Sequence, residues 1–100
     1  MAAHDELLSL RTLVLRGREV AFTQAFLVWQ RDGQQLTWSG SARGAALEGI
    51  VADGQEVSLT AASLDGRTVS GRVVVMQPEG LAGLLAFAGS GPLIIQGREL

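Results

Sequence analysis

Residues 17–38 read GREVAFTQAFLVWQRDGQQLTW, and they give the clearest indication of the fold. Two runs rich in β-branched and aromatic residues lie on either side of the step Asp32-Gly33. Such a step between extended runs is typical of a tight β-hairpin, because glycine adopts the positive φ that the turn requires. The stretch therefore predicts a hairpin with strands at residues 19–31 and 34–41.

The same pattern returns in residues 54–77, GQEVSLTAASLDGRTVSGRVVVMQ, around the step Asp65-Gly66. It predicts a second hairpin with strands at 55–63 and 67–77. A third echo stands at the end, where QGREL (96–100) resembles RGREV (16–20). Duplication and convergence on residues that suit hairpins both explain these echoes. The last echo raises the hypothesis that residues 97–100 begin a strand completed by another chain.

The remaining segments extend the β pattern over a single domain, residues 1–100, with residues 1–6 expected to be frayed. We expect strands at 7–15, 46–52 and 93–96, and a glycine-rich loop at 39–44. Leucine spacing indicates one short helix at 79–86, with a strand as the alternative reading. The fold class is therefore all-β: a small barrel or sandwich of about 7–8 antiparallel strands joined mostly as hairpins.

Two-residue turns at Asp32-Gly33 and Gly17-Arg18 predict which side chains share a face of the sheet. Both turns give one apolar face, made of Leu8, Leu10, Val14, Ala25, Leu27, Trp29, Leu36 and Trp38. The opposite face is also apolar and holds Leu13, Leu15, Val20, Phe22, Phe26 and Val28. In a sheet with one solvent-exposed face, apolar and polar residues alternate along each strand, and these strands do not show that alternation. Either a bent strand therefore serves two packing layers, or the second face lies in a subunit interface.

Composition excludes several classes of function. The chain has no cysteine and a single histidine, so disulfides and a structural zinc site are excluded. A net charge of −2 gives no electrostatic footprint for nucleic acid or for an anionic membrane. No apolar run approaches the roughly 20 residues of a membrane-spanning helix, and no signal peptide is evident, so we expect a cytoplasmic protein.

No catalytic constellation is evident, so we expect no enzyme, no cofactor and no metal site. His4 is isolated near the N-terminus, no Gly-x-Ser-x-Gly motif occurs, and the Asp-Gly aspartates suit turns. Trp29 and Trp38 suit a core better than a stacking platform, although an open platform would bind a ligand. Candidate ligand or interface residues are Phe22, Phe26, Trp29, Trp38 and Arg43.

Two functions follow as expectations. The first is a non-catalytic assembly or interaction module that buries apolar strand surface against a copy of itself or against another protein. The alternative is a small-ligand or carbohydrate-binding module that uses Trp29, Trp38 and the 40–44 loop, where Arg43 is available to contact an anion.

Overall fold

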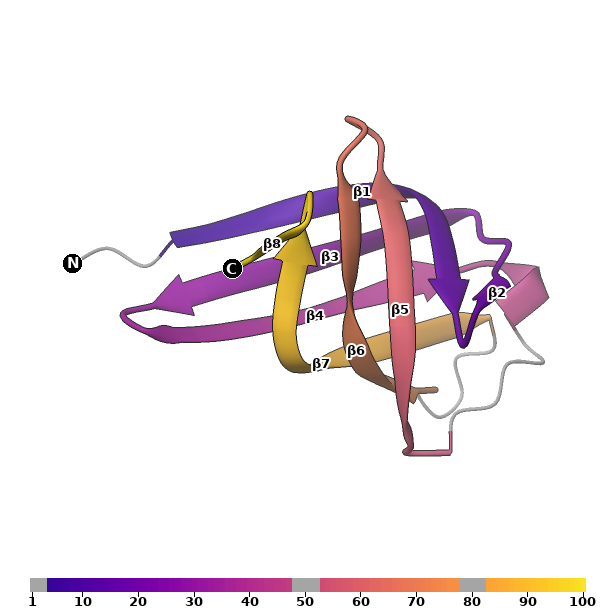
Figure 1. Ribbon diagram of the computed structural model, residues 1–100. Helices are drawn as coiled ribbons and strands as arrows, with labels where there is room; N and C mark the ends of the chain where they lie inside the picture. The colour runs from indigo at the N-terminus through magenta and orange to yellow at the C-terminus, as the bar shows by residue number, and fades with distance from the viewer. Residues whose placement is uncertain (1–3, 48–52, 78–82) are drawn as a thin grey trace.

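Six antiparallel strands close into a barrel in the computed structural model, which describes residues 4–47, 53–77 and 83–100 (Figure 1). Around the barrel the order is β1-β3-β4-β7-β6-β5, and β5 pairs back with β1. Two short strands, β2 and β8, pair antiparallel with the ends of β1 and β7. The strands are β1 His4–Leu15, β2 Arg18–Glu19, β3 Gln24–Asp32, β4 Gln35–Arg43, β5 Glu56–Ser63, β6 Thr68–Met76, β7 Leu84–Ile95 and β8 Arg98–Glu99. The predicted all-β class is confirmed, in its barrel form.

The first predicted hairpin is β3–β4, and its register differs from the expected one by two residues. Trp29 pairs with Trp38 rather than with Leu36, because the two-residue loop is Gly33-Gln34. Gly33 has φ 65°, which suits the first central position of a type II′ turn. A shift of two residues keeps every side chain on its face, so the predicted tryptophan face survives.

The second predicted hairpin, β5–β6, forms with strand bounds within one residue of those expected. A three-residue loop, 64–66, joins its strands, since Ser63 N–H donates to the Arg67 carbonyl at 2.8 Å. Gly66 has φ 91°, the left-handed conformation that closes such loops.

A bulge in β1 decides which apolar residues form the core. Leu8 and Leu10 point inward, and the register with β5 shifts between Leu10 and Thr12. Beyond this shift Leu13 and Leu15 point inward, because one extra residue exchanges the two faces of a strand. The predicted pair Leu8–Leu27 is confirmed.

The predicted second apolar face was therefore wrong in part, and the barrel has a single core. Leu13, Leu15 and Val20 belong to that core, whereas Val14 is only half-buried. Phe22 packs against the core from the segment between β2 and β3. The buried set is Leu8, Leu10, Leu13, Leu15, Val20, Ala25, Leu27, Trp29, Trp38, Ala42, Leu47, Val57, Leu59, Ala61, Val69, Val73, Val75, Leu85, Phe87, Leu93 and Ile95.

Three other expectations change. Strand β1 includes residues 4–6, which we expected to be frayed, and residues 1–3 lie outside the described ranges. In place of a strand at 46–52, residues 45–47 form a 3-10 turn and 48–52 are outside the described ranges. The helix at 79–86 was wrong for residues 84–86, which belong to β7, and 78–82 are likewise outside. Glycine is a poor helix former, so the strand reading prevails there.

The loop expected at 39–44 is mostly strand, because β4 continues to Arg43. Gly40 stands opposite Leu27, and a Cβ there would collide with the Leu27 side chain and the Phe26 carbonyl oxygen. The glycine thus permits a close approach between neighbouring strands, which is a common reason for glycine within a sheet.

The echo between residues 16–20 and 96–100 has a matching geometry. In β1–β2 the loop is Arg16-Gly17 rather than the expected Gly17-Arg18, and in β7–β8 it is Gln96-Gly97. Arg16 and Gln96 both have φ 55°, as a type I′ turn requires. Residues 97–100 thus fold back on their own chain, since Leu100 N–H donates to Leu93 O at 2.9 Å.

Candidate functional site

An uncharged patch covers the outside of five neighbouring strands of the barrel. Each strand alternates inward and outward residues, so the register places the outward ones in rows across the sheet. One row follows the pairs Leu7–Val28, Val28–Ser39, Ser39–Ala88 and Ala88–Val74. The adjacent row runs Ser9–Phe26–Ser41–Ala86–Met76. We call these ten residues the uncharged face: Leu7, Ser9, Phe26, Val28, Ser39, Ser41, Val74, Met76, Ala86 and Ala88.

The uncharged face is broad and has a low centre. Along the curved wall of the barrel, five strands at about 4.8 Å spacing span roughly 20–24 Å. Its centre, on β4 and β7, carries only serine and alanine, whereas larger apolar side chains flank that centre on β1, β3 and β6. Leu7 is 59% exposed and Met76 is 46% exposed, and with the half-buried Phe26, Val28 and Val74 they form the apolar part of the face.

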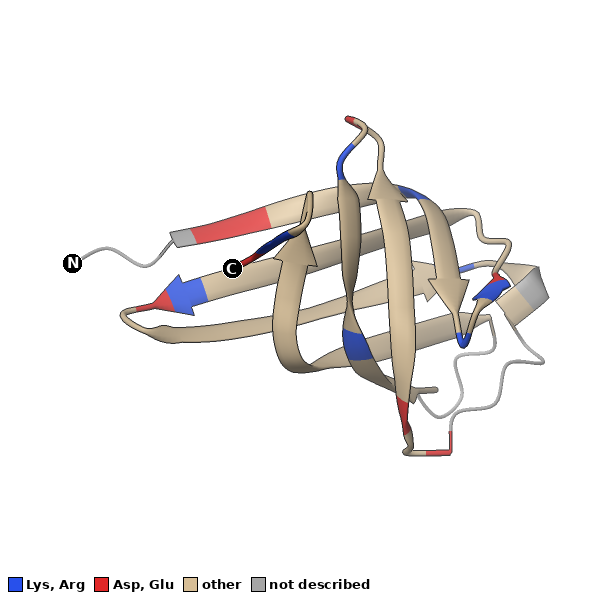
Figure 2. Ribbon diagram, in the orientation of Figure 1, with Lys and Arg blue, Asp and Glu red and all other residues tan. Residues whose placement is uncertain are grey.

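Charges of opposite sign lie at the two ends of this face. Asp5 precedes Leu7 by two residues on β1, and Arg11 follows Ser9 by two (Figure 2). Arg43 lies two residues beyond Ser41, at the same end as Arg11. All three are exposed, and none forms an ion pair with another described residue. The face therefore has an acidic end and a basic end.

The charges near the β6 side of the face are satisfied within the chain. Arg72 pairs with Glu56, and the Ser90 hydroxyl donates to Glu56 Oε2 at 2.6 Å. Hydrogen bonds from Ser90 and Arg72 lower the pKa of Glu56. This side of the face adds no uncompensated charge.

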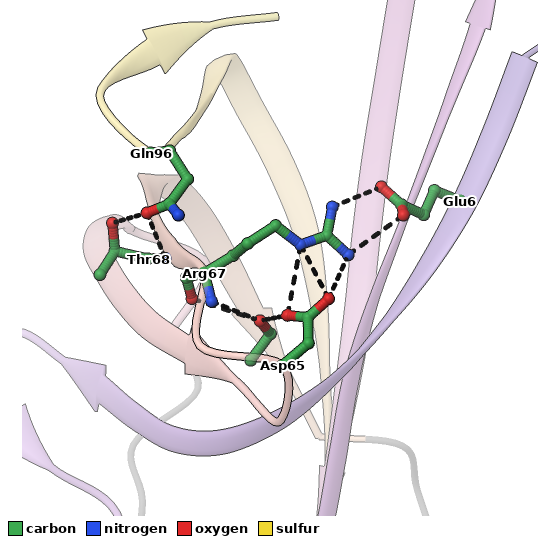
Figure 3. Close-up of polar contacts among 6 residues, drawn as sticks. Glu6, Asp65, Arg67, Thr68 and Gln96 are labelled. Carbon is green, nitrogen blue, oxygen red and sulfur yellow. Dashed lines mark hydrogen bonds and ion pairs between the residues drawn. The ribbon is translucent and has the colours of Figure 1, made fainter.

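A second polar cluster holds the start of β1 against the β5–β6 loop (Figure 3). The Arg67 guanidinium donates to both oxygens of Glu6, at 3.0 and 3.1 Å. Its Nε donates to Asp65 Oδ2 at 3.0 Å. The Arg67 backbone N–H donates to Ser63 Oγ at 2.9 Å, and that hydroxyl in turn donates to Asp65. Arg67 thus binds two carboxylates at once, and we assign the cluster a structural role.

These contacts shift the pKa values of the charged side chains in the cluster. Hydrogen bonds from Arg67 and Ser63 lower the pKa of Asp65 to about 2. The bidentate contact with Arg67 lowers the pKa of Glu6, with a further contribution from the Trp29 side chain. The two carboxylates raise the pKa of Arg67. All three groups therefore stay charged at neutral pH, which suits a fixed tie better than proton transfer.

The structure separates the five residues that the sequence singled out. Trp29 and Trp38 are 7% and 6% exposed, and Trp38 Nε1–H donates to the Gly91 carbonyl at 3.0 Å. Phe26 lies in the uncharged face and Arg43 at its basic end. Sequence reasoning missed the contribution of β6 and β7 to this face. The short apolar run in residues 84–88, LLAFA, was the available signal for a strand at β7.

No family model, curated protein or solved structure matches this chain. Within residues 4–47, 53–77 and 83–100, no three acidic, histidine or cysteine side chains gather as a metal site. The same ranges contain no helix with the length and apolar character needed to cross a membrane.

Proposed function

We propose that this protein is a non-catalytic assembly module that binds a second copy of itself through the uncharged face. The observation that carries the proposal is the ten-residue patch, two rows deep across five strands, without a single charge. Exposed apolar surface is characteristic of protein interaction sites, and half of the ten residues are large and apolar: Leu7, Phe26, Val28, Val74 and Met76. Two sheets packed face to face bury such surfaces about 10 Å apart.

The arrangement of charge favours a second copy as the partner. In a two-fold symmetric dimer both copies use the same patch. When the two-fold axis runs across the strands, the acidic end of one copy covers the basic end of the other. Asp5 of each copy then approaches Arg11 of its partner, and the flat serine and alanine centres meet. Complementary charge at the rim fixes the orientation of such an interface more than it strengthens it.

The size of the patch predicts a weak dimer. A stable interface buries about 800 Å² on each partner, over roughly 20–30 residues. Ten residues and their charged rim fall below that size, so we expect a dissociation constant of about 10–100 µM. The burial of Trp29 and Trp38 argues against the alternative in which their rings form an open platform for a carbohydrate.

Sedimentation velocity of matched variants tests the proposal. The substitution Val28→Glu places a charge within the face on β3, and Ala86→Glu places one at its centre on β7. Thr60→Glu adds the same charge on β5, outside the face, and serves as control. We expect the wild type and the control to dimerise as concentration rises, and both face variants to remain monomeric with unchanged far-UV circular dichroism.

Two results would overturn the proposal. One is a wild type that remains monomeric to several hundred micromolar, well above the expected constant. The other is a dimer that survives both face substitutions, because an interface elsewhere would then hold it together.

A further inference from the structure

A cleft opens in the barrel wall where β7 leaves β4. Strand β4 pairs with β3 along its whole length, but only residues 39–43 pair with β7. The gap has a volume of about 450 Å³. It is lined by Leu36, Thr37, Trp38, Ser39, Ala88, Gly89, Gly91, Pro92, Glu99 and Leu100.

Glycine and proline residues in β7 create this cleft. Gly91 has φ 86°, a conformation that side chains disfavour, and Pro92 has no N–H to donate to a ladder. The register between β6 and β7 shifts at the same place, between Ser70 and Arg72. Strand β7 therefore turns away from β4, and the buried Trp38 lies among the residues that line the gap.

The indole of Trp38 forms a fixed wall of the cleft. It lies so close to Gly89 that a Cβ there would be 2.5 Å from three of its ring atoms. A Cβ on Gly71 would be 2.6 Å from Cζ2 of the six-membered ring. The hydrogen bond to Gly91 O also fixes the orientation of the ring, so this wall exists before any ligand arrives.

The residues that line the cleft include several apolar side chains and one charged side chain. Leu36 and Leu100 are half-buried and, with Pro92, supply apolar surface. Glu99 is the single ionisable side chain among the lining residues. It is exposed and forms no ion pair with any described residue, in contrast to Glu6, Glu56 and the Arg67-bound Asp65.

We propose that this cleft binds a small organic cation, an apolar or aromatic group that carries an ammonium. The apolar part contacts Leu36, Pro92 and Leu100 beside the Trp38 ring, and the ammonium lies at the Glu99 carboxylate. The volume is within the range of small-molecule sites, and apolar walls with one placed polar group are their usual composition.

Titration of ¹⁵N-labelled protein with 2-phenylethylamine tests this site. The two indole N–H resonances give an internal comparison, because Trp38 lines the cleft and Trp29 does not. We expect a saturable, millimolar shift of the Trp38 resonance and of the Pro92-flanking amides, with little change at Trp29. Phenylacetate, which has the same ring and the opposite charge, should bind at least fivefold more weakly, on the order of one surface ion pair.

A matched pair of variants isolates the role of the carboxylate. Glu99 in β8 and Glu19 in β2 occupy equivalent places in the two similar hairpins, and Glu19 is not among the cleft residues. We expect Glu99→Gln to weaken binding of 2-phenylethylamine about fivefold and Glu19→Gln to leave it unchanged.

Two results would overturn the inference. One is the absence of any saturable shift at Trp38, and the other is equal affinity for the amine in the Glu99→Gln and Glu19→Gln variants. Ser39 and Ala88 belong both to the cleft and to the uncharged face. The titration is therefore repeated in Val28→Glu, so that the outcome does not depend on dimerisation.

Discussion

The substitution Gly89→Ala tests how Trp38 closes the barrel wall. The new Cβ would be 2.5 Å from Cδ2, Cε2 and Nε1 of the indole, where carbon atoms prefer about 3.5–4.0 Å. The ring therefore has to move by about 1 Å. Such a movement pulls Nε1–H away from Gly91 O, its partner at 3.0 Å. Trp38 is buried in the close-packed core, which leaves the ring little room to tilt instead.

The contributions to this effect are of known size. Overpacking of a core costs about 1–3 kcal/mol, and the weakened indole hydrogen bond about 1 kcal/mol. Alanine restricts the unfolded chain more than glycine, which returns about 0.4–1 kcal/mol. We expect a net loss of about 1–3.5 kcal/mol in the free energy of unfolding, measured by urea denaturation followed by circular dichroism.

A double-mutant cycle gives the control for this prediction. Trp38→Leu removes the ring and is destabilising by itself, because a large buried side chain is lost. In that background Gly89→Ala has nothing to collide with, so its cost should fall below about 0.5 kcal/mol. The reasoning is refuted if Gly89→Ala leaves stability unchanged in the wild type, or if its cost is the same with and without the ring.

Two further predictions concern the turns and the polar cluster. Arg16→Asn should raise the free energy of unfolding by less than about 1 kcal/mol, because asparagine tolerates φ 55° better than arginine but the exposed ion pair between Arg16 and Asp53, at 3.1 Å, is lost. Gln96→Asn shortens the side chain whose Oε1 accepts from Thr68 N–H at 3.2 Å, so it should gain no more than Arg16→Asn in the same urea assay; a larger gain would contradict this. The pKa of Asp65 is lowered, so its stabilising contribution is present above about pH 4 and is lost as pH falls toward 2. The stability difference between the wild type and Arg67→Gln should shrink over that interval, and a difference independent of pH would refute the assignment.

Local patterns in the sequence were sufficient for the hairpins and for the composition of the core. Asp32-Gly33 and Asp65-Gly66 marked both long hairpins, because the need for positive φ is a property of a few neighbouring residues. The tryptophan face also followed, since strand alternation is insensitive to a register shift of two residues.

The features that depend on contacts between distant strands could not be predicted from the sequence. The bulge in β1 exchanges the faces of Leu13 and Val14, and it arises from pairing with β5 about 50 residues away. The sequence predicted a loop at Gly40. The atoms that leave no room for a Cβ there belong to Phe26 and Leu27 on β3, and the residues around Gly40 do not reveal them. The uncharged face runs along the outside of the barrel from β1 to β6, so its four residues on β6 and β7 could not be predicted until the order of strands was known.

An isotope-filtered NOE experiment on a mixture of labelled and unlabelled protein tests the central claim most directly. It detects only contacts between different copies of the chain. We predict contacts of the Val28, Ala86 and Val74 methyl groups with the same patch on the partner. Contacts confined to the outside of β5, around Thr60, or no intermolecular contact at millimolar concentration, would contradict it.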